Sequence, residues 1–89
     1  MIKRTAFEKL DQEDPLGHFR SQFLLPDDVI YLDGNSLGPV SRPGRERLLQ
    51  TLDYEWQPDL IKSWNQHQWI NLPAQLGDQI GAIVGAGPG

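Results

Sequence analysis

Apolar residues lie in short groups along this sequence, and proline or glycine separates almost every group from the next. Phe7 and Leu10 would share one side of a short helix that Thr5 caps and Pro15 closes. A second group has apolar side chains three and four residues apart and stops before Pro26, which predicts another short helix. Its members are Leu16, Phe19 and Phe23. The first third of the chain therefore predicts two short helical arms.

One run has the composition of a β-strand. Residues 29–32 read Val-Ile-Tyr-Leu, and turn-forming residues flank this β-branched and aromatic run on both sides. The run predicts a single short edge strand. The next stretch, residues 34–39, reads GNSLGP and is too rich in glycine and asparagine for a regular element. We expect it to be a loop.

The longest helical periodicity follows this loop. Ser41 can cap a helix there, with Pro43 in the first turn, where the missing N–H of proline has no intrahelical partner to lose. Pro58 would end the helix. The predicted apolar face consists of Leu48, Leu49, Leu52 and Trp56. This pattern predicts that Trp56 lies in a core.

The remaining third of the chain predicts one more helix. Residues 59–72 have no clean periodicity, so they should be irregular or weakly helical. From about Pro73 the apolar side chains form one stripe again, and Gly85 is placed to end the helix. The stripe consists of Leu72, Leu76, Ile80, Ile83 and Val84. The closing GAGPG follows this helix, whereas a dinucleotide-binding glycine loop follows a strand, so we interpret it as a helix end.

Composition narrows the functional classes. Twelve acidic and eight basic side chains give a net charge of -4, and the basic residues do not cluster as phosphate binding requires, so we expect no nucleic-acid partner. No apolar stretch is long enough to span a bilayer and no signal-like start is present, so we expect no membrane partner and a cytoplasmic location. The lack of cysteine excludes a disulfide framework, a thiolate nucleophile and a cysteine-based zinc site. Nine glycines and seven prolines interrupt the apolar runs, so autonomous folding should be marginal.

Titratable side chains are not grouped as catalysis or metal binding requires. His18 and His67 are the only histidines, and neither has a carboxylate or a second histidine at ligand spacing. We interpret both as surface or hydrogen-bonded residues, with His67, which lies between two tryptophans, the stronger candidate for a role. Two carboxylate groups beside prolines are interpreted as solvated turns. They are Asp11, Glu13 and Asp14, and Asp27 and Asp28.

Two features suit a ligand. In the loop, Asn35 and Ser36 supply an amide and a hydroxyl, and the flanking glycines let backbone approach a bound molecule. A plain strand-to-helix turn would have the same composition. Trp64 and Trp69 lie in the irregular segment among amide side chains, and aromatic faces next to amides suit a planar ligand. Physical reasoning alone leaves the nature of that ligand open.

Three segments together resemble the beginning of the bacterial kynureninases. They read IYLDGNSLGPVSRP, LIKSWNQHQWINLP and LGDQIGAIVGAGPG, and the likeness extends from about Phe19 to Gly89. The set is specific, although a small-residue loop near the N-terminus also occurs in related pyridoxal-phosphate enzymes of aminotransferase class V. The resemblance implies that residues 1–89 are the N-terminal segment of a larger catalytic chain. It also implies the α/β fold of the type I pyridoxal-phosphate-dependent transferases, of which this piece would be mainly helical with one short strand.

The same resemblance implies an activity and a substrate pocket. Kynureninases are homodimers that use pyridoxal phosphate to hydrolyse L-kynurenine to anthranilate and L-alanine in tryptophan breakdown, and they act similarly on 3-hydroxykynurenine. Ser36 and Trp64 match positions of the family's substrate pocket. Trp64 would pack on the aminobenzoyl ring, and Ser36, helped by Asn35, would line its polar edge. The implied partner is therefore a small-molecule substrate.

The residues that hold the cofactor in this family have no match here. The lysine that carries it, the aspartate that faces its ring nitrogen and the phosphate-binding loop are missing, and Lys3, Lys9 and Lys62 fit none of these contexts. We therefore expect the chain alone to be inactive, with no catalytic, cofactor-binding or metal-binding residue.

Two alternative interpretations remain. One is a piece of another class V pyridoxal-phosphate enzyme, a desulfurase or aminotransferase, which would have no evident use for a tryptophan pair beside a serine loop. The other is a small interaction module that docks on a partner through an exposed apolar helix face. That face would consist of Leu48, Leu52 and Trp56. The module requires that the chain folds unaided.

Overall fold

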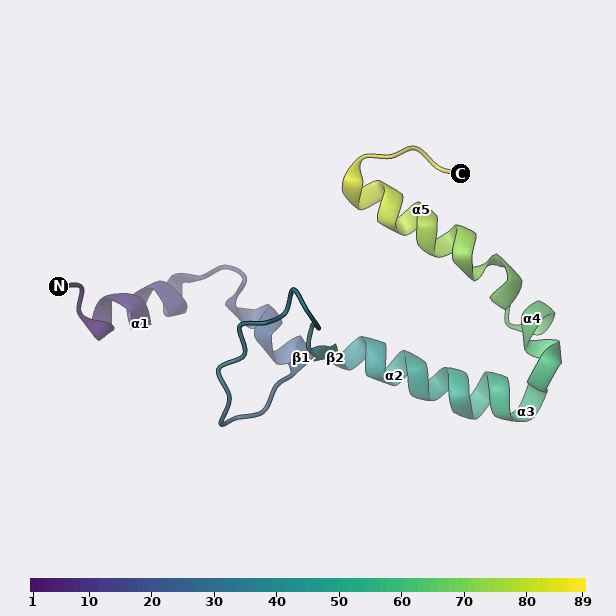
Figure 1. Cartoon of the computed structure of the whole chain (residues 1–89), viewed down its shortest axis with the longest axis horizontal. Coiled ribbons are helices and arrows are strands. Elements are labelled where there is room, and N and C mark those ends of the chain that lie inside the picture. The colour runs from purple at the N-terminus through teal and green to yellow at the C-terminus, as the bar shows by residue number, and fades with distance from the viewer. The chain divides into compact units, whose positions relative to one another are not determined.

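A computed structural model describes all 89 residues of the chain (Figure 1). The chain divides into two compact units, Met1–Arg47 and Leu48–Gly89. Most residues in regular elements are helical, and the only sheet has two short strands. The expectation of a mainly helical piece is confirmed. The single expected strand at residues 29–32 is absent, and two short strands form elsewhere in the sequence.

The first unit begins with helix α1, Arg4–Glu13. Its N-cap is Lys3 rather than the expected Thr5, which lies inside the first turn and makes no capping hydrogen bond. Arg4 forms an ion pair with Glu8 at 2.8 Å, one turn along the helix, and this pairing favours a helix that already includes Arg4. The predicted helix is therefore present, but its predicted cap is wrong.

The second predicted helix is shorter than expected. Its place is taken by the 3₁₀ helix η1, Gly17–Gln22, and Phe23 belongs to strand β1, Phe23–Leu24. Strand β2, Val40–Ser41, pairs with β1 in the antiparallel sense, with Phe23 opposite Ser41 and Leu24 opposite Val40. Pairing with β2 holds Phe23 in extended backbone, so the helix stops at Gln22.

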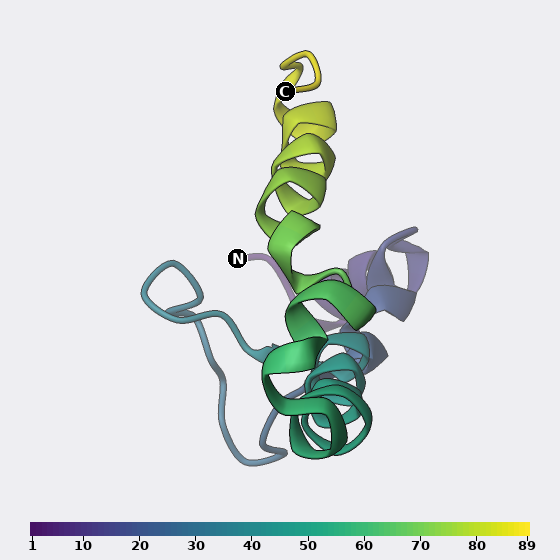
Figure 2. The ribbon, with the colours of Figure 1, turned by 90° about the vertical axis from the view of Figure 1, so that its right-hand side faces the viewer.

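Residues 29–32, the expected strand, form no strand. A strand needs a neighbour that pairs with its backbone N–H and C=O groups, and no segment of this unit pairs with residues 29–32. Their side chains are not covered either, since Ile30 is 89% and Leu32 88% exposed. β-Propensity without a neighbouring strand is not sufficient. These residues belong to the open loop between β1 and β2, which Figures 1 and 2 show without regular structure.

Helix α2, Arg42–Gln50, begins where Ser41 predicts. The Gly44 N–H donates to Ser41 Oγ at 3.1 Å, which confirms Ser41 as the cap. The helix continues as the wider π-helix η2, Thr51–Trp56, and then as α3, Gln57–Asp59. Pro58 therefore lies within the helical run rather than at its end, because the π-helix directly before it changes the hydrogen-bond pattern at the point where proline lacks an N–H.

Leu60 interrupts the helical run. Its backbone has φ 50° and ψ -129°, a combination that L-residues with a side chain rarely adopt. Short turns follow, namely η3, Leu60–Lys62, α4, Ser63–Gln66, and η4, Trp69–Asn71. Figure 2 shows these turns at one end of the last helix. The expectation of an irregular or weakly helical segment is confirmed.

The last helix, α5, Leu72–Val84, ends as expected at Gly85. Gly85 has φ 78°, in the left-handed region, and the Ala86 N–H donates to the Gly81 carbonyl at 2.9 Å. This backbone bond is typical of a glycine-terminated helix. The GAGPG sequence is therefore a helix end, as its position after a helix predicts.

No apolar side chain is buried in this chain. Trp56, expected in a core, is 57% exposed, and Leu76 and Ile80 of the α5 stripe are 51% and 61% exposed. The amphipathic helices are present, but nothing in the 89 residues covers their apolar faces. None of the helices combines the length and the apolar character needed to cross a membrane.

Candidate functional site

The loop after residue 32 is organised around Asp33. The backbone N–H groups of Ser36 and Leu37 donate to the Asp33 carbonyl at 3.1 and 3.3 Å. The Ser36 hydroxyl donates to the Asp33 carboxylate, with 2.8 Å between Oγ and Oδ1. This bond uses the only hydroxyl hydrogen of Ser36 and leaves its oxygen able to accept. The loop is therefore a hydrogen-bonded turn that presents Ser36 in one orientation.

Tyr31 closes the same loop from the other side. Its hydroxyl contacts the Leu37 carbonyl and lies 3.2 Å from the Asp33 carbonyl. The single hydroxyl hydrogen is shared between two acceptors, so the Tyr31 hydroxyl links the Asp33 and Leu37 ends of the turn. The composition of residues 29–32 indicated only that Tyr31 belongs to a strand. No rule of sequence spacing predicts that its hydroxyl contacts the carbonyls of the following loop.

Asn35 occupies the middle of the turn and is exposed. Its side chain makes no hydrogen bond within the chain, so both its carbonyl and its NH₂ group face solvent. The loop thus offers an amide and an acceptor oxygen side by side. This pair of groups suits the polar edge of a ligand.

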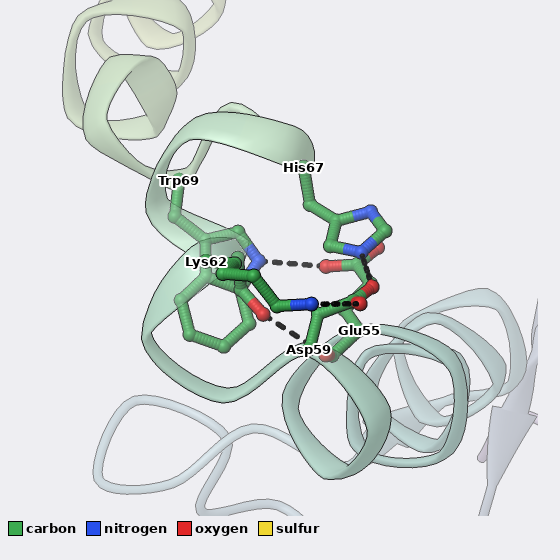
Figure 3. A network of polar contacts seen from close by, with 6 residues as sticks. Glu55, Asp59, Lys62, His67 and Trp69 are labelled. Atoms are coloured by element: carbon green, nitrogen blue, oxygen red, sulfur yellow. Dashed lines mark hydrogen bonds and ion pairs between the residues drawn. The ribbon is translucent and has the colours of Figure 1, made fainter.

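The second unit contains a polar cluster, shown in Figure 3, that we call the Glu55 cluster. It consists of Glu55, Asp59, Lys62, Ser63, His67 and Trp69. Glu55 is only 7% exposed, and its Oε2 accepts a hydrogen bond from Trp69 Nε1 at 2.7 Å. Ser63 is fully buried, and its hydroxyl donates to the Glu55 backbone carbonyl at 2.9 Å. Glu55 is therefore bonded through both its side chain and its backbone.

Asp59 links two further members of the cluster. Its Oδ2 lies 2.7 Å from His67 Nε2, and its Oδ1 lies 3.7 Å from Lys62 Nζ. The hydrogen bond with His67 lowers the pKa of Asp59. Partial burial raises this pKa, and the positive charge of Lys62 lowers it, so the net effect is a lowered pKa. The interpretation of His67 as a hydrogen-bonded residue is confirmed, although no sequence spacing indicated Asp59 as its partner. The intervening turns of η3 and α4 bring together two residues that are eight positions apart.

His18 differs from His67. It is exposed in η1, and its ring lies 4.1 Å from that of Phe19. The interpretation of His18 as a surface residue is confirmed. The two carboxylate groups beside prolines are exposed as well, although Asp11 and Glu13 lie in α1 rather than in a turn.

Trp64 lies in α4, beside the Glu55 cluster, and is 47% exposed. Its ring contacts Trp69 edge to face, with 6.4 Å between centroids and 69° between planes. Trp69 is half-buried, whereas much of the Trp64 indole faces outward. Trp64 therefore combines a contact with the Trp69 ring and an exposed aromatic surface.

The expected substrate-binding residues are divided between the two units. Asn35 and Ser36 belong to the first unit, and Trp64 belongs to the second. No group of three or more histidine, aspartate or glutamate side chains is arranged to hold a metal ion. The lysines do not form a cofactor site either, because Lys3 and Lys9 are exposed at α1 and Lys62 is exposed and paired with Asp59.

Comparison with known proteins finds relatives that share one name, kynureninase. No protein-family model matches the chain. It is 49% identical to the kynureninase of Burkholderia pseudomallei (strain 1106a) over 89 residues, which is 100% of this chain and 21% of that enzyme. The kynureninase of Burkholderia mallei (strain SAVP1) is 49% identical over 86 residues, 97% of this chain and 21% of that enzyme. The kynureninase of Deinococcus radiodurans is 42% identical, over 93% of this chain and 22% of that enzyme. The resemblance is thereby confirmed: over its whole length the chain is similar to kynureninases, and it spans about a fifth of the length of these relatives.

Proposed function

We propose that these 89 residues are the N-terminal segment of a pyridoxal-phosphate-dependent kynureninase. The whole protein would hydrolyse L-kynurenine, and 3-hydroxykynurenine, to L-alanine and the corresponding anthranilate. The observation that carries this proposal is the 49% identity to kynureninase over all 89 residues. The helical composition of the chain is compatible with a piece of the larger α/β fold of type I pyridoxal-phosphate enzymes.

In this proposal Trp64 packs on the aminobenzoyl ring of the substrate. Its outward-facing indole surface supports this role, because an aromatic face that is not already covered can stack on a planar ring. Ser36 and Asn35 line the polar edge of the same ring. Their support is the acceptor oxygen of Ser36, which the bond to Asp33 leaves available, and the unpaired amide of Asn35.

The cofactor would be held by residues outside these 89. Pyridoxal phosphate supplies the electron sink for cleavage of the carbon–carbon bond when it is bound. None of the three lysines here has the setting of a cofactor-carrying lysine, so the contribution of this segment is to bind and orient the substrate ring. We further propose that the whole protein is a cytoplasmic homodimer, as the resemblance implies.

A chimera tests the proposal. These 89 residues would replace the matching segment of the Burkholderia pseudomallei kynureninase, and hydrolysis of L-kynurenine and 3-hydroxykynurenine would be measured. We expect kcat/KM within about tenfold of the parent enzyme, which corresponds to about 1.4 kcal/mol of transition-state stabilisation. A folded, dimeric chimera that retains its cofactor but does not hydrolyse kynurenine would contradict the proposal. Activity on cysteine or on an amino-group acceptor instead would favour another class V enzyme.

A further inference from the structure

The carboxylate of Glu55 lies away from solvent in the second unit. At 7% exposure it is one of the few buried residues in the chain. Burial of a carboxylate is costly unless hydrogen bonds compensate for the lost water, and the Trp69 indole N–H provides such a bond at 2.7 Å. This arrangement fixes the Trp69 ring, because a rotation about its side-chain bonds would leave the carboxylate without that donor.

The ring of Trp69 in turn contacts the ring of Trp64. The edge-to-face geometry, 6.4 Å between centroids at 69°, places the edge of one indole against the face of the other. Trp69 is half-buried and bonded, whereas Trp64 is 47% exposed. Trp69 is therefore the fixed partner of the pair, and its orientation limits the orientations that Trp64 can adopt.

Glu55 also acts on Trp64 through the backbone. The hydroxyl of Ser63, the residue directly before Trp64, donates to the Glu55 carbonyl at 2.9 Å and is fully buried. This bond fixes the start of α4, where Trp64 is the second residue. Residue 55 thus acts on Trp64 by two routes. The Glu55 carboxylate holds the ring of Trp69 (Figure 3), and the backbone carbonyl holds Ser63.

We infer that Glu55 is a positioning residue for Trp64, acting through Trp69, and that it sets the angle at which the Trp64 indole meets the substrate ring. This inference rests on the proposed function, in which Trp64 packs on the aminobenzoyl group. A stack of two planar rings depends on their relative orientation. Loss of the Glu55 side chain should therefore weaken substrate binding by changing the orientation of the Trp64 indole, although the indole itself is still present.

The kynureninase chimera described above provides the test. Glu55→Ala removes the acceptor, Trp69→Phe removes the donor while keeping a ring, and Glu55→Gln keeps an acceptor oxygen without the charge. We expect kcat/KM for kynurenine to fall about tenfold in Glu55→Ala, mainly through a rise in KM. In Trp69→Phe kcat/KM should fall less, and in Glu55→Gln it should stay within about threefold of the value for the unsubstituted chimera. Asp53→Ala, an exposed acid on the same helix η2, is the matched control and should have no effect.

Circular dichroism provides a second measurement that does not depend on activity. Two indoles in contact give an exciton couplet, which can be isolated as the difference from a Trp64→Phe chimera. The couplet should be lost in Glu55→Ala and retained in Glu55→Gln, at a temperature where both are folded. A couplet that survives in Glu55→Ala overturns the inference, as does a lost couplet with an unchanged KM.

The two proposals fail in different ways. An unsubstituted, folded chimera that does not hydrolyse kynurenine contradicts the proposed function, but the couplet still decides whether Glu55 orients Trp64. A chimera that hydrolyses kynurenine while the Glu55 and Trp69 variants keep its KM, and while Glu55→Ala keeps its couplet, leaves the proposed function intact and rejects the positioning role. A lower melting temperature in Glu55→Ala with unchanged KM and couplet means a purely structural residue and also rejects it.

Discussion

The three tryptophans of this chain differ in what surrounds their rings, although they fall within 14 residues of sequence. Trp69 is half-buried and bonded to Glu55. Trp64 contacts the Trp69 ring and is 47% exposed, and Trp56 is 57% exposed with no ring partner. Residue type alone therefore does not assign a role to any of them. Their contacts distinguish three roles. Trp69 fixes the position of its neighbour, Trp64 is a candidate ligand-binding residue, and Trp56 belongs to an apolar surface that nothing in the chain covers.

The kinetic effect of Trp64 follows from its exposed indole. In the chimera, Trp64→Ala removes an apolar face and an aromatic contact worth about 0.5 to 1.5 kcal/mol beyond area burial. With the lost burial, we expect transition-state stabilisation to fall by about 2 to 4 kcal/mol, measured as kcat/KM for kynurenine. Trp56→Ala is the matched control, since Trp56 has similar exposure and its ring contacts no other aromatic ring. Equal kcat/KM in Trp64→Ala and the unsubstituted chimera would remove Trp64 from the substrate pocket.

The pKa of Asp59 gives the second unit a pH dependence. The hydrogen bond with His67 holds this pKa below its ordinary value of 3.8, and Lys62 adds to the effect. A carboxylate with a lowered pKa stabilises the fold above its ordinary value, and this contribution is lost as the pH falls through the lowered value. Glu55, the other acid of the cluster, is bonded to Trp69.

We therefore expect the melting temperature of the chimera to drop as the pH falls below about 4, and to drop less in Asp59→Asn. Thermal melts across this range, followed by circular dichroism, give the comparison. Parallel pH profiles for the two proteins would show that the Asp59–His67 bond does not stabilise the native state.

At the scale of elements, the start of α2 depends on one hydroxyl. Ser41 Oγ accepts from the Gly44 N–H, one of the first donors of the helix, which has no partner inside the helix. We expect Ser41→Ala to lower the free energy of unfolding of the chimera by about 1 kcal/mol, and Ser41→Asp, which keeps a capping oxygen, to cost much less. Denaturant unfolding measures both. If Ser41→Asp lowers the free energy of unfolding as much as Ser41→Ala, the substitutions disturb the pairing of β2 rather than the helix cap.

Elements could be predicted where local chemistry decides them. The cap at Ser41 and the glycine end at Gly85 depend on neighbours within five residues, and both predictions are confirmed. Residues 29–32 could not be predicted in this way, because a strand forms only with a partner and β-propensity says nothing about one. The continuation of the helical run through Pro58 could not be predicted either. Sequence rules place a helix end before a proline, and no sequence pattern identifies a π-helix that precedes one.

In the candidate site, too, the residue types could be predicted from local sequence, whereas their contacts could not. The composition of the loop indicated Asn35 and Ser36, and the segment around Trp64 indicated an aromatic surface. The contacts that orient these residues were not predictable, because they join groups that are distant in sequence or come from backbone atoms. Tyr31 bonds carbonyls of the loop, and Glu55 bonds an indole 14 residues away. No periodicity relates such pairs.

At the scale of the whole molecule, the chain has no buried apolar side chain, although its helices are amphipathic. Burial of apolar surface is the main driving force for folding, so a chain without it has little to offset the loss of conformational entropy. We expect the isolated 89-residue chain to melt gradually, without a cooperative transition, by circular dichroism and calorimetry. The same segment within the chimera should melt with the rest of the enzyme. A sharp transition of the isolated chain would favour the small interaction module.

The backbone at Leu60 has a consequence for engineering. With φ 50° and ψ -129°, this residue adopts a conformation that suits glycine, and such conformations cost roughly 1 to 3 kcal/mol when a Cβ is present. Its side chain is 62% exposed, so removing it sacrifices little contact. Glycine adds about 0.5 to 1 kcal/mol of unfolded-state entropy, which is smaller than the strain it relieves. Leu60→Gly should therefore raise the unfolding free energy of the chimera by about 1 kcal/mol, whereas Leu60→Ala, which keeps the Cβ, should not. If denaturant titrations confirm this difference, a more stable variant of the chimera is available from a single glycine substitution.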